Sequence, residues 1–169
     1  MISLTPIKSI YDSFGKQPGY LNDEPRDVTV SLEMISYGPE KLDRVSFDSL
    51  SKALDKRTAE GVNWLIYKGI PSREELELLG ATFRLDNLIL EDIQNCPMLR
   101  PGYVATEDYL FATVKFPLVA SESDYRMTPM CYIGSGNTIV TFLHSGNVSL
   151  EPLIDRLVNS KGRIRSRGI

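Results

Sequence analysis

The sequence predicts a three-layer α/β/α domain built on a mixed, partly antiparallel central sheet. Strand and helix patterns alternate in the first half of the chain, and strand patterns follow one another in the second half. Alternation favours parallel strand pairs with helices on the faces, whereas consecutive strands form hairpins. The apolar run over 62–67, between Gly61 and Gly69, is typical of a strand buried on both faces.

The first elements follow from hydrophobic periodicity. Residues 28–35 alternate between apolar and polar side chains with period 2, which predicts a strand. Phe47, Leu50 and Leu54 fit one face of a helix, with its cap expected among residues 43–46.

Two helices are predicted after the apolar strand. Ser72 and Glu75 have the spacing of a capping box, in which a hydroxyl and a carboxylate each satisfy an amide at the helix start. The packed stripe of this helix is expected to contain Leu76, Leu79 and Phe83. A second, short helix begins after Leu85, with Asp86 as its N-cap.

The second half of the chain is predicted to be rich in strands. Tyr109 to Phe116 form a strand of aromatic and β-branched residues that Pro117 closes. Residues 127–133 and 138–142 form a hairpin, and Pro129 indicates an edge or a bulge at the start of its first strand. An amphipathic helix follows, with apolar residues at Leu150, Leu153, Ile154, Leu157 and Val158.

Length and composition exclude several classes of protein. The 169 residues suffice for one domain, which we divide into an N-terminal loop region over 1–27 and an α/β domain over 28–169. The net charge of −3 argues against nucleic acid as a partner. No apolar run approaches the roughly 20 residues of a membrane span, and no signal peptide is evident.

The candidate site is an acidic pair near the end of the second short helix. On a helical wheel that starts at Leu85, Asp92 falls back onto the apolar stripe, and Glu91 lies about a third of a turn away. A carboxylate on a buried face must be compensated. Backbone amides or an arginine such as Arg100 would compensate it, and so would a divalent cation such as Mg²⁺, which prefers carboxylate oxygens. Adjacent carboxylates diverge, so the pair would serve two ions more readily than one.

The remaining chemically active residues are expected to be structural. Cys96 and Cys131 are far apart, lack a partner motif and are interpreted as single thiols. His144 is the only histidine and lies in a predicted strand-end loop, where a structural or solvent role is expected. No His-rich or Cys-x-x-Cys arrangement indicates a zinc site. Trp64 is expected in the core.

A series of short motifs resembles the cytoplasmic N-terminal domain of CorA-type magnesium and cobalt channels, a family that also includes zinc transporters. The motifs are Val62-Asn63-Trp64, Leu79-Gly80-Ala81-Thr82-Phe83, Leu90-Glu91-Asp92-Ile93, Arg100-Pro101, Glu107-Asp108-Tyr109-Leu110-Phe111 and Gly136-Asn137. The match covers roughly residues 28–169. It departs from the family pattern at Gly102, where a lysine is usual.

The resemblance implies the regulatory domain of a homopentameric divalent-cation channel on the cytoplasmic side of the cell membrane, and not an enzyme. In the family, Mg²⁺ binds between neighbouring domains and holds the pore closed. Carried over by position, Asp92 is the first metal ligand and Glu91 the second, with Co²⁺ or Zn²⁺ as alternative ions. The opposing ligands would come from a stalk helix beyond Ile169, and membrane contact from helices beyond it. The chain is therefore expected to be truncated before these segments.

An alternative function is a small Mg²⁺-dependent hydrolase that uses Glu91 and Asp92. Such an enzyme would need a third ligand or a base that converges on the pair. The sequence offers no obvious candidate for either.

Overall fold

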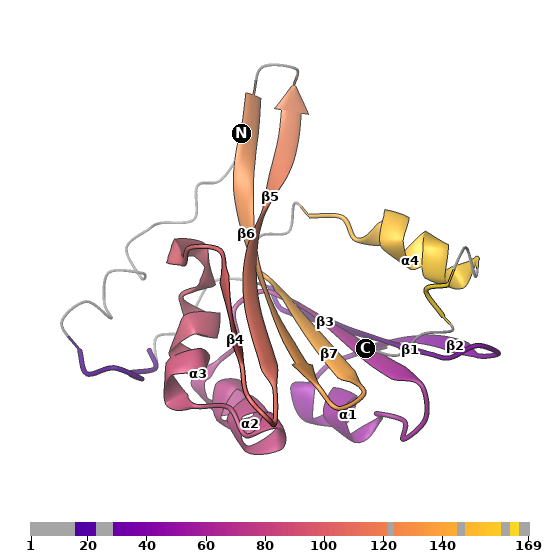
Figure 1. Cartoon of the computed structure of the whole chain (residues 1–169), viewed down its shortest axis with the longest axis horizontal. Helices are drawn as coiled ribbons and strands as arrows, with labels where there is room; N and C mark the ends of the chain where they lie inside the picture. Colours follow the sequence, from indigo (N-terminus) through magenta and orange to yellow (C-terminus); the bar gives the residue numbers. More distant parts are fainter. Residues whose placement is uncertain (1–15, 23–28, 122–123, 145–147, 160–162, 166–169) are drawn as a thin grey trace.

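The computed structural model describes residues 16–22, 29–121, 124–144, 148–159 and 163–165 (Figure 1). The strands are β1 (Ser31–Tyr37), β2 (Leu42–Phe47), β3 (Val62–Lys68), β4 (Gly102–Ala105), β5 (Leu110–Ser121), β6 (Asp124–Ser135) and β7 (Thr138–Leu143). The α-helices are α1 (Leu50–Asp55), α2 (Arg73–Phe83), α3 (Asn87–Gln94) and α4 (Glu151–Val158), and the 3-10 turn η2 (Cys96–Met98) follows α3.

The seven strands form one mixed sheet in the order β2-β1-β3-β7-β6-β5-β4. β3 and β7 are parallel, with Asn63 opposite Thr138 and Lys68 opposite Leu143. The other pairs within the described residues are antiparallel. The predicted mixed sheet is therefore confirmed, with the parallel pair at its centre.

Helices cover both faces of the sheet, which confirms the three-layer architecture. Figure 1 shows α1, α2 and α3 on one side of the sheet and α4 on the other. The first core cluster contains residues from the three helices on one side, and the second cluster contains Ile154 and Leu157 of α4.

The central strand β3 contributes to both clusters because its side chains alternate between the faces of the sheet. Leu65 and Tyr67 belong to the first cluster, whereas Trp64 and Ile66 belong to the second. The Trp64 indole Nε1 donates a hydrogen bond of 2.9 Å to the Thr141 hydroxyl. This satisfies the polar atom of the buried tryptophan. Trp64 is a core residue, as predicted.

The predicted capping box is present at the start of α2. The Glu75 amide donates to the Ser72 hydroxyl over 3.3 Å, and the Ser72 amide donates to the Glu75 carboxylate over 2.9 Å. Asp86 occupies the N-cap position of α3 without a side-chain cap bond. Its carboxylate instead accepts a hydrogen bond of 2.8 Å from the Tyr109 hydroxyl.

The prediction of a helix from Phe47 is wrong at its start. Residues Leu42–Phe47 form strand β2, and α1 begins at Leu50 with Ser49 as its N-cap. Val45 and Phe47 are half-buried between exposed neighbours, which is the period of a strand at a sheet edge. The short edge strand β4 was also not predicted, because all four of its residues are exposed and provide no apolar alternation.

Strands β5 and β6 are longer than the sequence predicts, because neither of their prolines ends a strand. Pro117 lies inside β5, beyond Thr113, the last β5 residue that pairs with β4. Pro129 lies opposite Lys115 in β6, just outside the ladder to β7, which begins at Met130. Each proline therefore lies where its strand has one neighbour. The predicted edge position of Pro129 is confirmed.

The N-terminal segment is described only in part. Residues 16–22 have no helix or strand, and Leu21 belongs to the first core cluster. The predicted boundary between 27 and 28 lies outside the described residues, and the division into two regions stays a prediction. Within the described ranges, no helix has the length and apolar character needed to cross a bilayer.

We expect the variant Gly61→Ala to lower the free energy of unfolding by roughly 1–3 kcal/mol. Gly61 has a φ of +77°, and a Cβ there would lie 2.4 Å from the Tyr37 carbonyl oxygen. Urea denaturation monitored by circular dichroism measures the change. Gly134→Ala is the matched control, since a Cβ at that position meets no heavy atom of the described residues within 4 Å. Equal midpoints for the two variants would contradict this role of Gly61.

Candidate functional site

The acidic pair lies on α3, whose packing sets the direction of both carboxylates. Ile89, Leu90 and Ile93 are buried and hold the helix on the sheet. Leu85 precedes the N-cap Asp86, so it lies outside the helix and is not a valid origin for a helical wheel. The buried stripe of α3 contains Ile89, Leu90, Ile93 and Gln94, so its centre lies between Leu90 and Ile93. Asp92 lies at its margin and is half-buried, which corrects the prediction that it lies in the middle of the stripe.

Asp92 faces an open cavity of about 240 Å³ beside the edge strand β4. The cavity is lined by Asp92, Leu99, Arg100, Gly102, Tyr103, Val104, Phe111 and Thr113. Arg100 lines the same cavity, yet no ion pair or hydrogen bond joins its side chain, or any other described side chain, to the Asp92 carboxylate. The Arg100 and amide contacts considered from the sequence are therefore not made within the described part of the chain.

The electrostatics of Asp92 follow from its partial burial. Burial raises the pKa of the Asp92 carboxyl above its ordinary value, and the neighbouring Glu91 charge raises this pKa further. The ionised carboxylate is thus incompletely compensated in the folded chain. A cation in the cavity would stabilise the ionised form directly.

Glu91 is held by the N-terminal segment. Its Oε2 accepts a hydrogen bond of 2.6 Å from the Gly19 amide. One turn further on, the Gln94 side chain accepts from the Asn22 amide over 2.8 Å and donates to the Asn22 carbonyl over 3.1 Å. Residues 19–22 are therefore fastened along α3. The two predicted ligands are not brought to one cavity, because Glu91 faces this segment and Asp92 faces β4.

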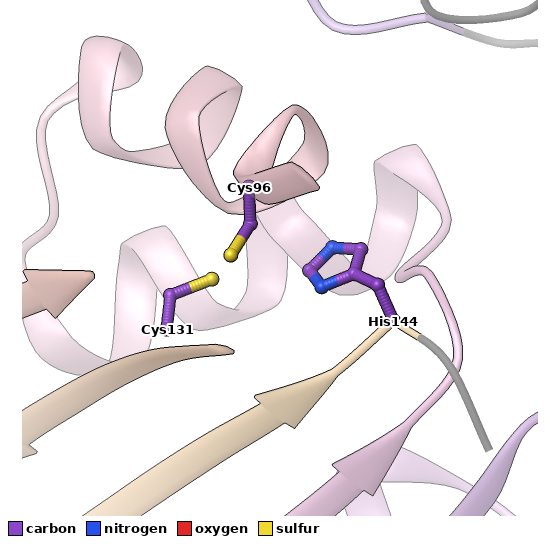
Figure 2. A group of neighbouring side chains, drawn as sticks. All are labelled: Cys96, Cys131 and His144. Atoms are coloured by element: carbon purple, nitrogen blue, oxygen red, sulfur yellow. The ribbon is translucent and has the colours of Figure 1, made fainter. Parts of the chain in front are cut away.

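A second group of reactive side chains lies beside α3. The sulfur atoms of Cys96 and Cys131 and a ring nitrogen of His144 all lie within 4.8 Å of one another. Figure 2 shows the three side chains converging from η2, from β6 and from the end of β7. Both cysteines are free thiols, as predicted, but the sequence does not predict that they lie side by side. The sequence carries no signal for the group, because the sheet pairing brings the three residues together.

The two thiols have different electrostatic environments. The pKa of the Cys96 thiol is lowered to about 6, first by a hydrogen bond with Cys131 and then by His144, against the opposing effect of burial. Burial raises the pKa of the Cys131 thiol well above its ordinary value. The Asp92 charge raises the pKa of both thiols, so the acidic residue lies within electrostatic reach of the pair.

One ring nitrogen of His144 makes a hydrogen bond, and the other makes none with the described residues. Its Nε2 lies 2.7 Å from the Ile93 carbonyl oxygen. A carbonyl oxygen only accepts, so Nε2 carries a proton and donates it. Nδ1 is buried and makes no hydrogen bond with the described residues. The imidazole is therefore oriented by the end of α3, and Nδ1 is the nitrogen left without a partner.

The fold is shared with solved structures of CorA, CmaX and ZntB. No family model matches the sequence, and no curated protein matches it. The CorA magnesium transporter of Methanocaldococcus jannaschii matches with a TM-score of 0.53 and 18% identity, over 84% of this chain and 41% of the transporter. The full-length CmaX protein matches with a TM-score of 0.59 and 13% identity, over 82% of this chain and 42% of CmaX.

A third solved structure extends this likeness. The ZntB cytoplasmic domain of Vibrio parahaemolyticus RIMD 2210633 has a TM-score of 0.53 and 9% identity, over 80% of this chain and 52% of that domain. At these identities the matches establish the fold, which is CorA- and ZntB-like as the motifs predicted. The chain spans about two fifths of the length of the CorA and CmaX proteins it matches.

We expect the variant Asp92→Asn to be more stable than the parent at neutral pH. The pKa of Asp92 is raised in the folded chain, so ionisation destabilises the fold above that pKa, and the amide removes this penalty. The advantage should shrink as the pH falls through the raised folded-state pKa, and it should end below the ordinary value of 3.8. Urea midpoints between pH 3 and pH 7 measure it.

Asp155→Asn is the matched control for this experiment. Asp155 is exposed on α4, an eight-residue helix like α3, and occupies the fifth position where Asp92 occupies the sixth. The control should change stability little at any pH. A stabilisation of Asp92→Asn that persists unchanged at low pH would contradict the electrostatic explanation.

Proposed function

We propose that this chain is the ion-sensing domain of a CorA-type divalent-cation transporter and that Asp92 binds a regulatory Mg²⁺. The observation that carries the proposal is the half-buried Asp92 carboxylate, which faces an open cavity and makes no ion pair with the described residues, although Arg100 also lines this cavity. Mg²⁺ binds protein sites through one or two carboxylates and retains several waters. A single carboxylate at a cavity mouth can therefore provide part of such a site.

The fold supports the transporter assignment. Domains of the same architecture occur in proteins described as a magnesium transporter and as ZntB. The motif Leu90-Glu91-Asp92-Ile93 lies on α3, and its Asp92, the first ligand by resemblance, lines the cavity. Co²⁺ and Zn²⁺ remain alternative ions for transport.

The cavity lies at an edge of the sheet, which suits a site completed by a second subunit. β4 is the outermost strand on that side, and its Tyr103 is 78% exposed at the cavity wall. Val104 beside it is also exposed. An apolar, unpaired edge next to an uncompensated carboxylate is the arrangement expected at a contact between protomers. We propose a homopentamer in the complete protein, in line with the resemblance.

The mechanism follows from the charge at this contact. Carboxylates that face one another across a subunit boundary repel, and bound Mg²⁺ joins them. The ion then favours the closed state by its higher affinity for that state. When the internal Mg²⁺ concentration falls, the sites empty and the equilibrium shifts toward opening. The Glu91 carboxylate accepts a hydrogen bond from the Gly19 amide. It can act as the second ligand to the same ion only after this hydrogen bond breaks, or it can bind a separate ion.

The membrane part of the transporter is proposed to lie beyond this chain. A stalk helix would provide the opposing carboxylates, and the transmembrane helices would follow it. This places the domain on the cytoplasmic side of the cell membrane. We propose no enzymatic role, because the cavity is lined by a single carboxylate among the described residues.

We expect millimolar Mg²⁺ to raise the thermal stability of a longer form that includes the stalk, and to have little effect on residues 1–169 alone. At ten times the dissociation constant, binding to the folded state contributes about 1.4 kcal/mol. The double variant Glu91→Ala, Asp92→Ala in the longer form should lose this response. Differential scanning calorimetry at fixed ionic strength measures it, with Asp155→Ala as the matched control.

If the double variant responds to Mg²⁺ like the parent, the assignment of the two ligands is wrong. The hydrolase alternative makes a different prediction. Robust Mg²⁺-dependent phosphoester turnover that Asp92→Asn abolishes would favour the enzyme over the sensor.

A further inference from the structure

The group formed by Cys96, Cys131 and His144 has the donor chemistry of a thiophilic metal site. Two sulfur atoms and one imidazole nitrogen are the donors that Zn²⁺ takes in tetrahedral sites. Thiolates also disfavour Mg²⁺, which requires oxygen ligands. The site proposed for Mg²⁺ and this group thus select for different ions.

The geometry is close to that of a bound ion. With zinc–sulfur bonds of about 2.3 Å and zinc–nitrogen bonds of about 2.0 Å, tetrahedral ligand atoms lie roughly 3.5–3.8 Å apart. The three donor atoms here lie within 4.8 Å of one another. A contraction of roughly 1.0–1.3 Å at most, the difference between 4.8 Å and these spacings, would therefore bring them to coordination distance.

The orientation of His144 is the most specific observation. Histidines that ligate metals usually donate their other N–H to a carbonyl or carboxylate, which fixes the ring and the tautomer. Here Nε2 donates to the Ile93 carbonyl over 2.7 Å, and the buried Nδ1 has no hydrogen-bond partner among the described residues. A buried nitrogen without a partner is costly. Metal coordination through Nδ1 would remove this cost.

Burial and charge agree with this assignment. Cys96 and Cys131 are both 0% exposed, and His144 is half-buried. Two thiolates in such a position would carry an uncompensated double negative charge, which a divalent ion neutralises. The three donors come from η2, β6 and the residue after β7, so one ion would join the end of α3 to two strands.

We propose that Cys96, Cys131 and His144 form a binding site for one zinc-like divalent ion, with the fourth position open to water or a small exogenous ligand. This site is distinct from the Asp92 cavity and does not depend on the proposed regulatory function. The ion would fix the junction between α3 and the sheet, directly behind the acidic pair.

The test is a titration of the reduced, metal-free protein with Co²⁺ without oxygen, followed by Zn²⁺. We expect one Co²⁺ per chain, with the near-ultraviolet charge-transfer absorption of cobalt–thiolate bonds and the visible bands of tetrahedral cobalt. Zn²⁺ should displace the Co²⁺ and abolish the charge-transfer absorption and the visible bands, whereas an excess of Mg²⁺ should leave both signals unchanged. Zn²⁺ should also raise the thermal unfolding midpoint of the parent protein, a measurement that does not depend on the folding of any variant.

Three variants make the assignment specific. Cys131→Ser and His144→Gln should weaken Co²⁺ binding at least about tenfold, by comparison with the losses caused by removing outer-shell partners. His144 is only half-buried, so its variant is the safer one for folding, and far-ultraviolet circular dichroism checks the fold of both. Asp155→Asn is the control and should bind Co²⁺ like the parent, since Asp155 is exposed on α4, on the other side of the sheet from α3.

The proposal is overturned if the cobalt spectrum lacks the charge-transfer absorption, or if folded His144→Gln binds as tightly as the parent. A disulfide between Cys96 and Cys131 in untreated protein, together with no metal binding after reduction, would also overturn it. Loss of the cobalt spectrum would leave the Mg²⁺ response of the longer form intact, so the two proposals fail separately.

Discussion

The parallel pairing of β3 with β7 is the constraint on which the rest of the structure depends. One side chain fixes its register. The side-chain NH2 group of Asn137 (Nδ2) lies within hydrogen-bond distance of three backbone carbonyl oxygens, at 3.0, 3.2 and 3.1 Å from those of Thr58, Ala59 and Gly61. The backbone carbonyl of Asn137 in turn accepts a hydrogen bond of 2.8 Å from the backbone amide of Asn63. The tight turn before β7 is thereby tied to the loop before β3, although nearly eighty residues separate them.

The register at the start of β7 determines what lies at its other end. Lys68 is opposite Leu143, so β7 ends beside the end of β3 and places His144 below the end of α3. β6 is paired with β7 so that Cys131 lies opposite Phe142. The thiol and the imidazole therefore reach the same region because of strand pairing, and α3 adds Cys96 through the turn that follows it. Asp92 is positioned by the same helix.

The sequence predicts those parts of the fold whose cause is local. The capping box of Ser72 and Glu75 and the run over 62–67 each contain their own signal, and both are observed. The edge strand β4 escapes prediction because its four exposed residues show no apolar alternation. In β2 the alternation covers only Val45, Ser46 and Phe47, which is too short to separate it from the helix that follows. The pairing partners of both strands lie elsewhere in the chain, and only the folded sheet identifies them.

The two groups of polar side chains differ in the same way. The direction of the Asp92 side chain can be estimated from the period of its own helix. The prediction was shifted toward the centre of the buried stripe because the helical wheel started at Leu85, which lies outside α3. The convergence of Cys96, Cys131 and His144 depends on two strand pairings and one helix end, none of which has a spacing motif. A group of side chains that tertiary structure brings together from distant parts of the chain is therefore identified only in the folded protein.

The prolines of the long hairpin have a consequence for the behaviour of the protein at high concentration. Beyond the ladders to β4 and β7, the hairpin is a two-stranded ribbon whose two flanks pair with no other strand of the described residues, and one flank carries Pro117 and the other Pro129. A proline offers no N–H to an arriving strand. Each flank is thus interrupted as a template for further chains, which guards the ribbon against growth into fibrils.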